Sequence, residues 1–222
     1  IREIANNKII SKEITDTSGS ILFSLDNKYI FYSKLDKNHR ARKIFRHEIG
    51  NFQNTDELIF EEKSDAFTVG ITLSSDEKYY FISTSDHNTS EQYFFKVDEK
   101  KPQPKLIKKR KKGILYSVSS WDNKFYNHTN EGAEDFKIEI SESLENQKWK
   151  SFIKPKNEVL IVSCVFLKNW IIRSETSNAL DRLFVRHMSK DTEEELIISD
   201  EKVCVPNVSL RQKDRNTNEV YI

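Results

Sequence analysis

The chain has 222 residues, of which 32% are charged and 36% hydrophobic, and its formal net charge is +1. Aromatic residues reach 11%, which excludes a disordered chain, because such chains are poor in aromatic side chains. The near-neutral charge gives no general attraction to nucleic acid or to a membrane surface, so we expect neither as a partner.

A short turn, in which an acid or an amide precedes Lys and an aromatic strand follows, recurs along the chain. Its copies lie at residues 26–31, 76–81, 122–126 and 167–172. Asp26 and Asp76 are 50 residues apart, and the next two intervals, to Asp122 and then to Lys168, are 46 residues each. Four-stranded propeller blades repeat with this period.

The segments around each turn repeat as well. Apolar runs precede the turns at 21–23, 67–71, 114–118 and 159–162, third strands follow at 43–47, 92–96, 136–140 and 182–186, and fourth strands close the units at 57–61, 105–108, 149–153 and 195–198. The first runs are nearly continuous and the last ones alternate, as inner and outer strands should. We predict an all-β propeller of four-stranded antiparallel blades, approximately 20–63, 67–109, 114–154 and 159–200, with minimal helix.

Each end of the chain supplies half a blade. Residues 1–15 resemble third and fourth strands, and residues 203–222 resemble first and second strands. Because the halves are complementary, we expect one split blade, and as a hypothesis a closed five-bladed ring in a single domain over 1–222. Both ends look cut, so we expect a fragment of a longer protein. Unpaired blade edges favour self-association.

Cysteine usage bears on the compartment. Cys164 and Cys204 both lie in apolar, strand-like runs, where buried free thiols are the expectation. A disulfide framework normally needs more cysteines in a smaller chain. A reducing, cytoplasmic location is therefore expected, with the periplasm as the open alternative.

Four stretches along the blades carry a family resemblance. They are residues 41–50, 57–63, 88–91 and 132–138, which are similar to the propeller of oligopeptidase B (protease II), a branch of the prolyl oligopeptidase family of serine peptidases. The resemblance implies a seven-bladed propeller joined to an α/β-hydrolase domain, cleavage of short peptides after Lys or Arg, and a propeller that keeps folded proteins out. This chain departs from that plan, since it holds about five blades of sequence and lacks the hydrolase domain.

The sequence shows neither the motifs of hydrolase catalysis nor those of metal binding. The nucleophile of such hydrolases sits in Gly-x-Ser-x-Gly, and no two of the five glycines, Gly19, Gly50, Gly70, Gly113 and Gly132, bracket a serine at that spacing. The histidines are His39, His47, His87, His128 and His187. His47, His87 and His128 lie in different repeats, and none of these three has a second metal ligand at the usual spacing. We expect surface or strand-edge roles for the histidines. We predict no catalytic, cofactor-binding or metal residue, and an isolated chain without peptidase activity.

Charged and aromatic clusters have simpler interpretations. The basic run Lys105, Lys108, Lys109, Arg110, Lys111 and Lys112 fits an outer strand and a solvated connection better than a nucleic-acid or lipid site. The acids Glu61, Glu62, Glu134 and Asp135 could draw basic peptides toward a tunnel, but ordinary strand-end charges are favoured.

We expect Trp121, Trp149 and Trp170 to pack between blades.

Two functions stay open. The chain is either the substrate-gating propeller of a serine oligopeptidase, docked on its hydrolase domain, or a free-standing propeller that binds a peptide or protein. The reading frame beyond Ile222 separates them, since a downstream Gly-x-Ser-x-Gly supports the first.

Overall fold

The computed structural model describes residues 2–9, 14–190, 192–197, 208–210 and 218–221. The chain forms two compact units, residues 1–117 and 118–222. Among the described residues, the regular secondary structure is strand apart from one 3₁₀ turn, η1 (Gln53–Thr55). In this part of the chain no helix is long and apolar enough to cross a membrane.

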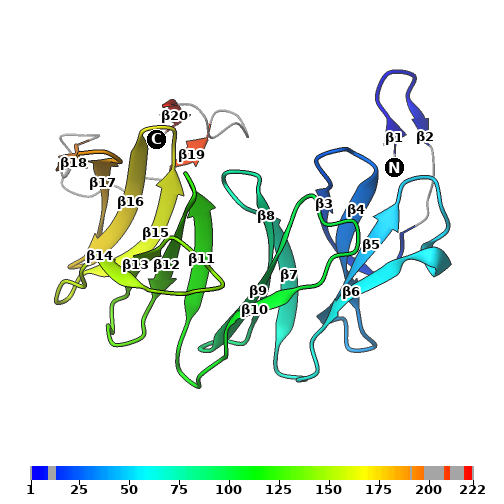
Figure 1. Ribbon diagram of the computed structural model, residues 1–222, viewed down its shortest axis with the longest axis horizontal. Helices are drawn as coiled ribbons and strands as arrows, with labels where there is room; N and C mark the ends of the chain where they lie inside the picture. Colours follow the sequence, from blue (N-terminus) through cyan, green and yellow to red (C-terminus); the bar gives the residue numbers. More distant parts are fainter. Residues whose placement is uncertain (1, 10–13, 191, 198–207, 211–217, 222) are drawn as a thin grey trace. The chain divides into compact units, whose positions relative to one another are not determined.

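Unit 1 contains two four-stranded antiparallel sheets, each a simple meander (Figure 1). Blade 1 consists of β3 (Thr17–Phe23), β4 (Tyr29–Leu35), β5 (Ala41–Glu48) and β6 (Glu57–Glu61). Blade 2 consists of β7 (Thr68–Leu73), β8 (Tyr79–Ser85), β9 (Ser90–Lys96) and β10 (Lys105–Lys108). A two-stranded sheet, β1 (Arg2–Glu3) with β2 (Lys8–Ile9), precedes them.

Unit 2 has the same organisation. Blade 3 consists of β11 (Tyr116–Trp121), whose first two residues belong to unit 1, β12 (Lys124–Thr129), β13 (Lys137–Ser141) and β14 (Lys150–Ile153). Blade 4 consists of β15 (Leu160–Phe166), β16 (Trp170–Ser177), β17 (Leu180–His187) and β18 (Glu193–Leu196). The pair β19 (Ser209–Leu210) and β20 (Val220–Tyr221) forms a further two-stranded sheet.

The predicted fold class is confirmed, because four antiparallel four-stranded sheets follow one another along the chain. The split blade and the five-bladed ring stay predictions. Each terminal pair forms a sheet of its own among the described residues, and the predicted strand at 203–205 lies outside them.

The repeated turn has a local chemical basis, seen best in blades 1 and 2. Ser24 Oγ donates to Asp26 Oδ1 at 2.6 Å and accepts the Tyr29 amide at 2.9 Å. Ser74 and Asp76 make the equivalent bond at 2.7 Å in blade 2. In each of these two blades, a serine and an aspartate bind each other and the turn backbone and so stabilise the hairpin. This recurrence explains why the turn anchors the repeat.

The core of unit 1 lies where blades 1 and 2 pack together. Its buried members are Phe31, Ile44, Ile59, Val69, Tyr80, Ile82 and Phe95. They come from alternate positions of neighbouring strands, which place side chains on one face of a sheet. In unit 2 a comparable core joins Trp121 and Tyr126 of blade 3 to Ile161 and Phe166 of blade 4, so Trp121 packs between blades as expected.

Candidate functional site

Two histidines are not the surface or strand-edge residues that the sequence indicated. His47 on β5 is fully buried, and its Nδ1 lies 2.7 Å from Asp56 Oδ1. His128 on β12 has Nε2 2.8 Å from the carbonyl of Ile161, and burial lowers its pKa below the usual range. Both were misjudged because their partners lie in other strands or loops.

The His47–Asp56 pair has the chemistry of a catalytic dyad but not the access. The side chains of His47 and Asp56 are 0% and 1% exposed. Asp56 Oδ2 accepts the Tyr32 hydroxyl at 2.7 Å, and Gln53 Nε2 donates to that hydroxyl at 3.2 Å and to the Thr15 carbonyl at 3.1 Å. The chain of bonds therefore ties the entry into blade 1 to its last loop. Among the described residues, no three His, Cys, Asp or Glu side chains form a metal-binding group.

A buried ion network joins blades 1 and 2. Arg110, just after β10, places Nη2 at 2.7 Å from Glu62 Oε2 and at 2.7 Å from Glu91 Oε2. Its Nε is 3.0 Å from Glu91 Oε2, and its backbone amide donates to Glu91 Oε1 at 2.9 Å. The guanidinium also stacks on Phe67, with Cζ 4.1 Å from the ring centroid. One cation thus holds two carboxylates from different blades.

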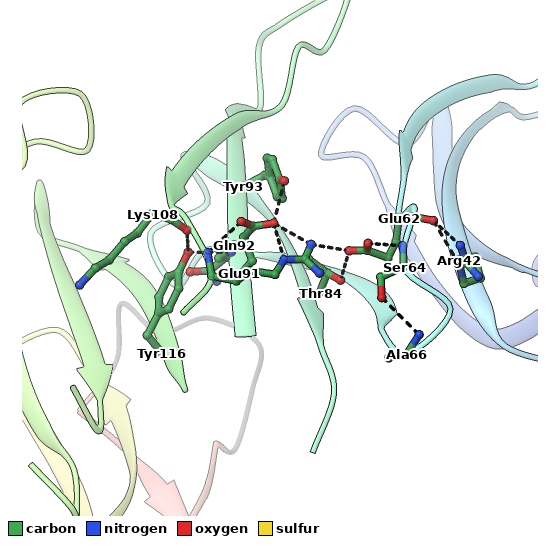
Figure 2. Close-up of polar contacts among 11 residues, drawn as sticks. Arg42, Glu62, Ser64, Ala66, Thr84, Glu91, Gln92, Tyr93, Lys108 and Tyr116 are labelled. Atoms are coloured by element: carbon green, nitrogen blue, oxygen red, sulfur yellow. Dashed lines mark hydrogen bonds and ion pairs between the residues drawn. The ribbon is translucent and has the colours of Figure 1, made fainter. Parts of the chain in front are cut away.

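The carboxylates of Glu62 and Glu91 accept further hydrogen bonds (Figure 2). Thr84 donates to Glu62 at 2.6 Å, and the Ser64 amide donates at 2.8 Å. Tyr93 donates to Glu91 at 2.9 Å. Burial opposes ionisation of each glutamate, but these donors and Arg110 outweigh it, so both pKa values fall below the ordinary one. Burial and the Glu91 bond raise the pKa of Tyr93 to about 12.

The network continues to the start of β11. The Tyr116 hydroxyl donates to the Lys108 carbonyl at 2.5 Å and accepts the Gln92 amide at 2.8 Å (Figure 2). Ser90 accepts the Tyr116 amide at 2.7 Å through Oγ and donates to the Tyr116 carbonyl at 2.8 Å. The connection between β10 and β11 is therefore held by hydrogen bonds against the start of β9 and is not simply solvated.

The predicted charge clusters separate into different environments. Arg110 belongs to the buried network, whereas its neighbours Lys109 and Lys112 are exposed. Glu61 is part-exposed and pairs with Lys43 and Lys63. Glu62 is only 4% exposed, so it is neither a strand-end surface charge nor accessible to a passing peptide. Glu134 is exposed.

Unit 1 also contains two pockets. One, of about 510 Å³, opens between the turn after β3 and the loop after β9. The other, of about 290 Å³, lies between β3 and β7 and has Ser18, Ser20 and Gly70 in its lining. Ser24 and Asp26 of the repeated turn line the larger pocket, and neither pocket has a histidine in its lining. The prediction of no catalytic, cofactor or metal residue stays a prediction.

Comparison with known proteins identifies the fold family. The family model described as "Prolyl oligopeptidase, N-terminal beta-propeller domain" matches residues 1–222. The chain belongs to this family. Its members' propeller is the fold class found here, and the oligopeptidase B resemblance noted in the sequence is confirmed by the relatives.

Two curated relatives and two solved structures illustrate the similarity. Protease 2 of Moraxella lacunata is 30% identical over 225 residues, which cover 100% of this chain and 32% of the relative. Dipeptidyl aminopeptidase BI of Pseudoxanthomonas mexicana is 22% identical over 188 residues, 83% of this chain and 26% of the relative. The structure of oligopeptidase B from Trypanosoma brucei superposes with a TM-score of 0.83 at 23% identity, over 88% of this chain and 29% of that one. The structure from Leishmania major also has a TM-score of 0.83, at 19% identity, over 90% of this chain and 30% of that one. This prolyl oligopeptidase propeller thus spans between about a quarter and a third of the relatives' length.

The ion network was missed at the sequence level, although a signal for it existed. Arg42, whose Nη2 donates to the Glu62 carbonyl at 2.8 Å, lies in the stretch 41–50. Glu62 and Glu91 lie in the stretches 57–63 and 88–91. Three of the four stretches that carry the family resemblance therefore meet at one place in the propeller.

Proposed function

We propose that this propeller is part of a serine oligopeptidase that cleaves short peptides after Lys or Arg. In it the propeller limits the entry of substrate and carries an α/β-hydrolase domain. The observation that supports this most is the family match over all 222 residues, combined with a chain that spans 32% of the relative named Protease 2. The remaining two thirds of such a relative leave room for a catalytic domain.

The buried network is consistent with a mechanical role. Arg110, Glu62 and Glu91 fix the junction between two blades, and a propeller that filters substrates by size needs blades that do not separate. The inner strands of a propeller surround its central channel, so a rigid ring sets the channel's width. Substrate size is then selected by the ring, and bond cleavage is left to the other domain.

The reading frame beyond Ile222 gives the first test. The proposal expects a Gly-x-Ser-x-Gly segment followed by Asp and His. A stop codon without that segment contradicts the proposal and favours the free-standing interaction propeller.

Activity gives the second test. The natural full-length protein is expected to cleave fluorogenic peptides that end in Arg or Lys, and not matched peptides that end in Leu or Asp. The 222-residue chain alone is expected to cleave none. Placing the same Arg site inside a folded protein should abolish cleavage, and equal cleavage of both forms would contradict the gating role.

We also propose that exposed outer strands allow copies of the propeller to associate, in a reducing, cytoplasmic setting. Leu58 on β6 and Leu106 on β10 are 46% and 38% exposed, and apolar side chains on edge strands favour pairing. Sedimentation of the wild-type chain should show dimers that the variant Leu58→Lys loses. Cell fractionation tests the compartment.

A further inference from the structure

The larger pocket of unit 1 has an aromatic floor. Phe31, Tyr80 and Phe95 are 3%, 2% and 1% exposed. Their ring centroids are 4.8 Å apart for Phe31 and Tyr80, 5.1 Å for Tyr80 and Phe95, and 6.0 Å for Phe31 and Phe95. Val97 and Pro102 extend the apolar lining. A volume of about 510 Å³ lies within the range of small-molecule sites, and aromatic walls suit a flat ring.

One polar group at this floor has no hydrogen-bond partner. The Tyr80 hydroxyl is buried beside the Leu25 backbone amide, but within the described residues it makes no hydrogen bond of acceptable geometry. A buried hydroxyl left unpaired costs free energy. Tyr80 itself lines the pocket, as does Leu25, which is 46% exposed.

Most charges at the rim are already engaged in structure. Arg46 donates to Glu57 at 2.5 Å and to the Lys100 carbonyl at 3.0 Å. Glu99 accepts the amides of Lys96 and Gln103 at 3.0 and 3.4 Å. These contacts fix the walls of the pocket and leave Arg46 and Glu99 little capacity for a ligand.

Asp26 and Lys28, also in the lining, pair with each other at 3.8 Å, and two further opposite charges at the rim remain available. Asp98 and Lys100 are exposed, line the pocket, and have no side-chain ion pair or hydrogen bond with any described residue. They are two positions apart in the same loop, so a ligand there meets one negative and one positive group together. A ligand that carries both an ammonium and a carboxylate next to an aromatic ring complements this arrangement.

We propose that this pocket binds a free aromatic α-amino acid. The ring packs on the floor that Phe31, Tyr80 and Phe95 form, while Asp98 binds the ammonium and Lys100 binds the carboxylate. The inference rests on the pocket alone and is independent of the peptidase role.

Calorimetric titration of the purified 222-residue chain tests the proposal with four probes. L-tryptophan carries both charges, N-acetyl-L-tryptophan lacks the ammonium, L-tryptophanamide lacks the carboxylate, and indole lacks both. Because each partly exposed ion pair contributes up to about 1 kcal/mol, tryptophan should bind about three- to five-fold more tightly than either singly charged probe. Equal affinity for all four probes, or no saturation by tryptophan up to its solubility limit, overturns the proposal.

Variants of exposed residues test which side chain binds the ammonium and which binds the carboxylate, and they should leave the fold intact. Asp98→Asn should remove the preference for tryptophan over N-acetyl-L-tryptophan, and Lys100→Gln should remove the preference over L-tryptophanamide. Lys101→Gln, an exposed neighbour outside the pocket lining, should leave both preferences intact. Tyr80→Phe should keep the fold and weaken tryptophan binding by a few-fold. Preferences that survive both Asp98→Asn and Lys100→Gln contradict the site.

Discussion

Arg110 Nη2 lies 2.7 Å from Glu62 Oε2 although the two residues are 48 positions apart. Glu62 follows the outer strand of blade 1, and Arg110 follows the outer strand of blade 2. The bond therefore links two repeats rather than two strands of one sheet. Each blade carries its own hairpins, so the contacts between blades decide whether neighbouring repeats stay together.

Replacing Arg110 by Met should destabilise the propeller. The variant keeps the stem of the side chain but leaves the carboxylates of Glu62 and Glu91, which are 4% and 6% exposed, without their cation. Breaking a buried pair in this way costs about 3 kcal/mol, which a urea-unfolding midpoint detects. Lys109→Met, an exposed neighbour in the same connection, should change the free energy of unfolding by less than about 0.5 kcal/mol. Equal effects of the two variants would show that the network is not stabilising.

Stability should fall as the pH is lowered through the acid range. Hydrogen bonds from Arg110 and other donors lower the pKa values of Glu62 and Glu91 in the folded chain, in spite of burial. A lowered folded-state pKa gives stability that is complete above the unfolded value of about 4.3 and is lost as the pH falls through the folded value. Unfolding free energies between pH 7 and pH 3 should therefore be flat at first and then drop. The double variant Glu62→Gln, Glu91→Gln should show a shallower drop, and an unchanged slope would contradict this assignment.

The sequence was informative where structure is local. The turns at Ser24–Asp26 and Ser74–Asp76 are built from residues two apart, so their repeat was visible and predicted the blades. The network could not be predicted, because Glu62, Glu91 and Arg110 meet only after two blades have packed. The same holds for His47, whose partner Asp56 lies across a loop. The polarity of histidine predicted an exposed side chain at position 47, but packing buries that side chain.

The thiol of Cys164 should resist alkylation while the chain is folded. The residue is partly exposed, but the protein atoms packed around its thiol raise the pKa to about 12, and Arg173 only partly offsets this. Since the thiolate is the reactive form, labelling by iodoacetamide at pH 8 should be slower than for an ordinary thiol by on the order of a hundred-fold or more. Peptide mass spectrometry should detect label at Cys164 only after urea is added. Fast labelling of the folded chain would contradict the pKa shift.

Ala179→Gly should stabilise blade 4. Asn178 and Ala179 form the two-residue hairpin between β16 and β17, with φ values of +50° and +59°. Such a turn requires positive φ at both central residues and favours glycine at the second, because a Cβ in the left-handed region costs about 1–2 kcal/mol. The added freedom of glycine in the unfolded chain offsets part of that gain, so the free energy of unfolding should rise by about 0.5–1 kcal/mol. Ala66→Gly, at an exposed position outside the positive-φ set, should instead lower the free energy of unfolding or leave it unchanged, because it adds the entropy cost without relieving strain. A rise in the free energy of unfolding for Ala179→Gly, with no rise for Ala66→Gly, is the expected result, and a loss of stability in Ala179→Gly would mean that Ala179 is not strained.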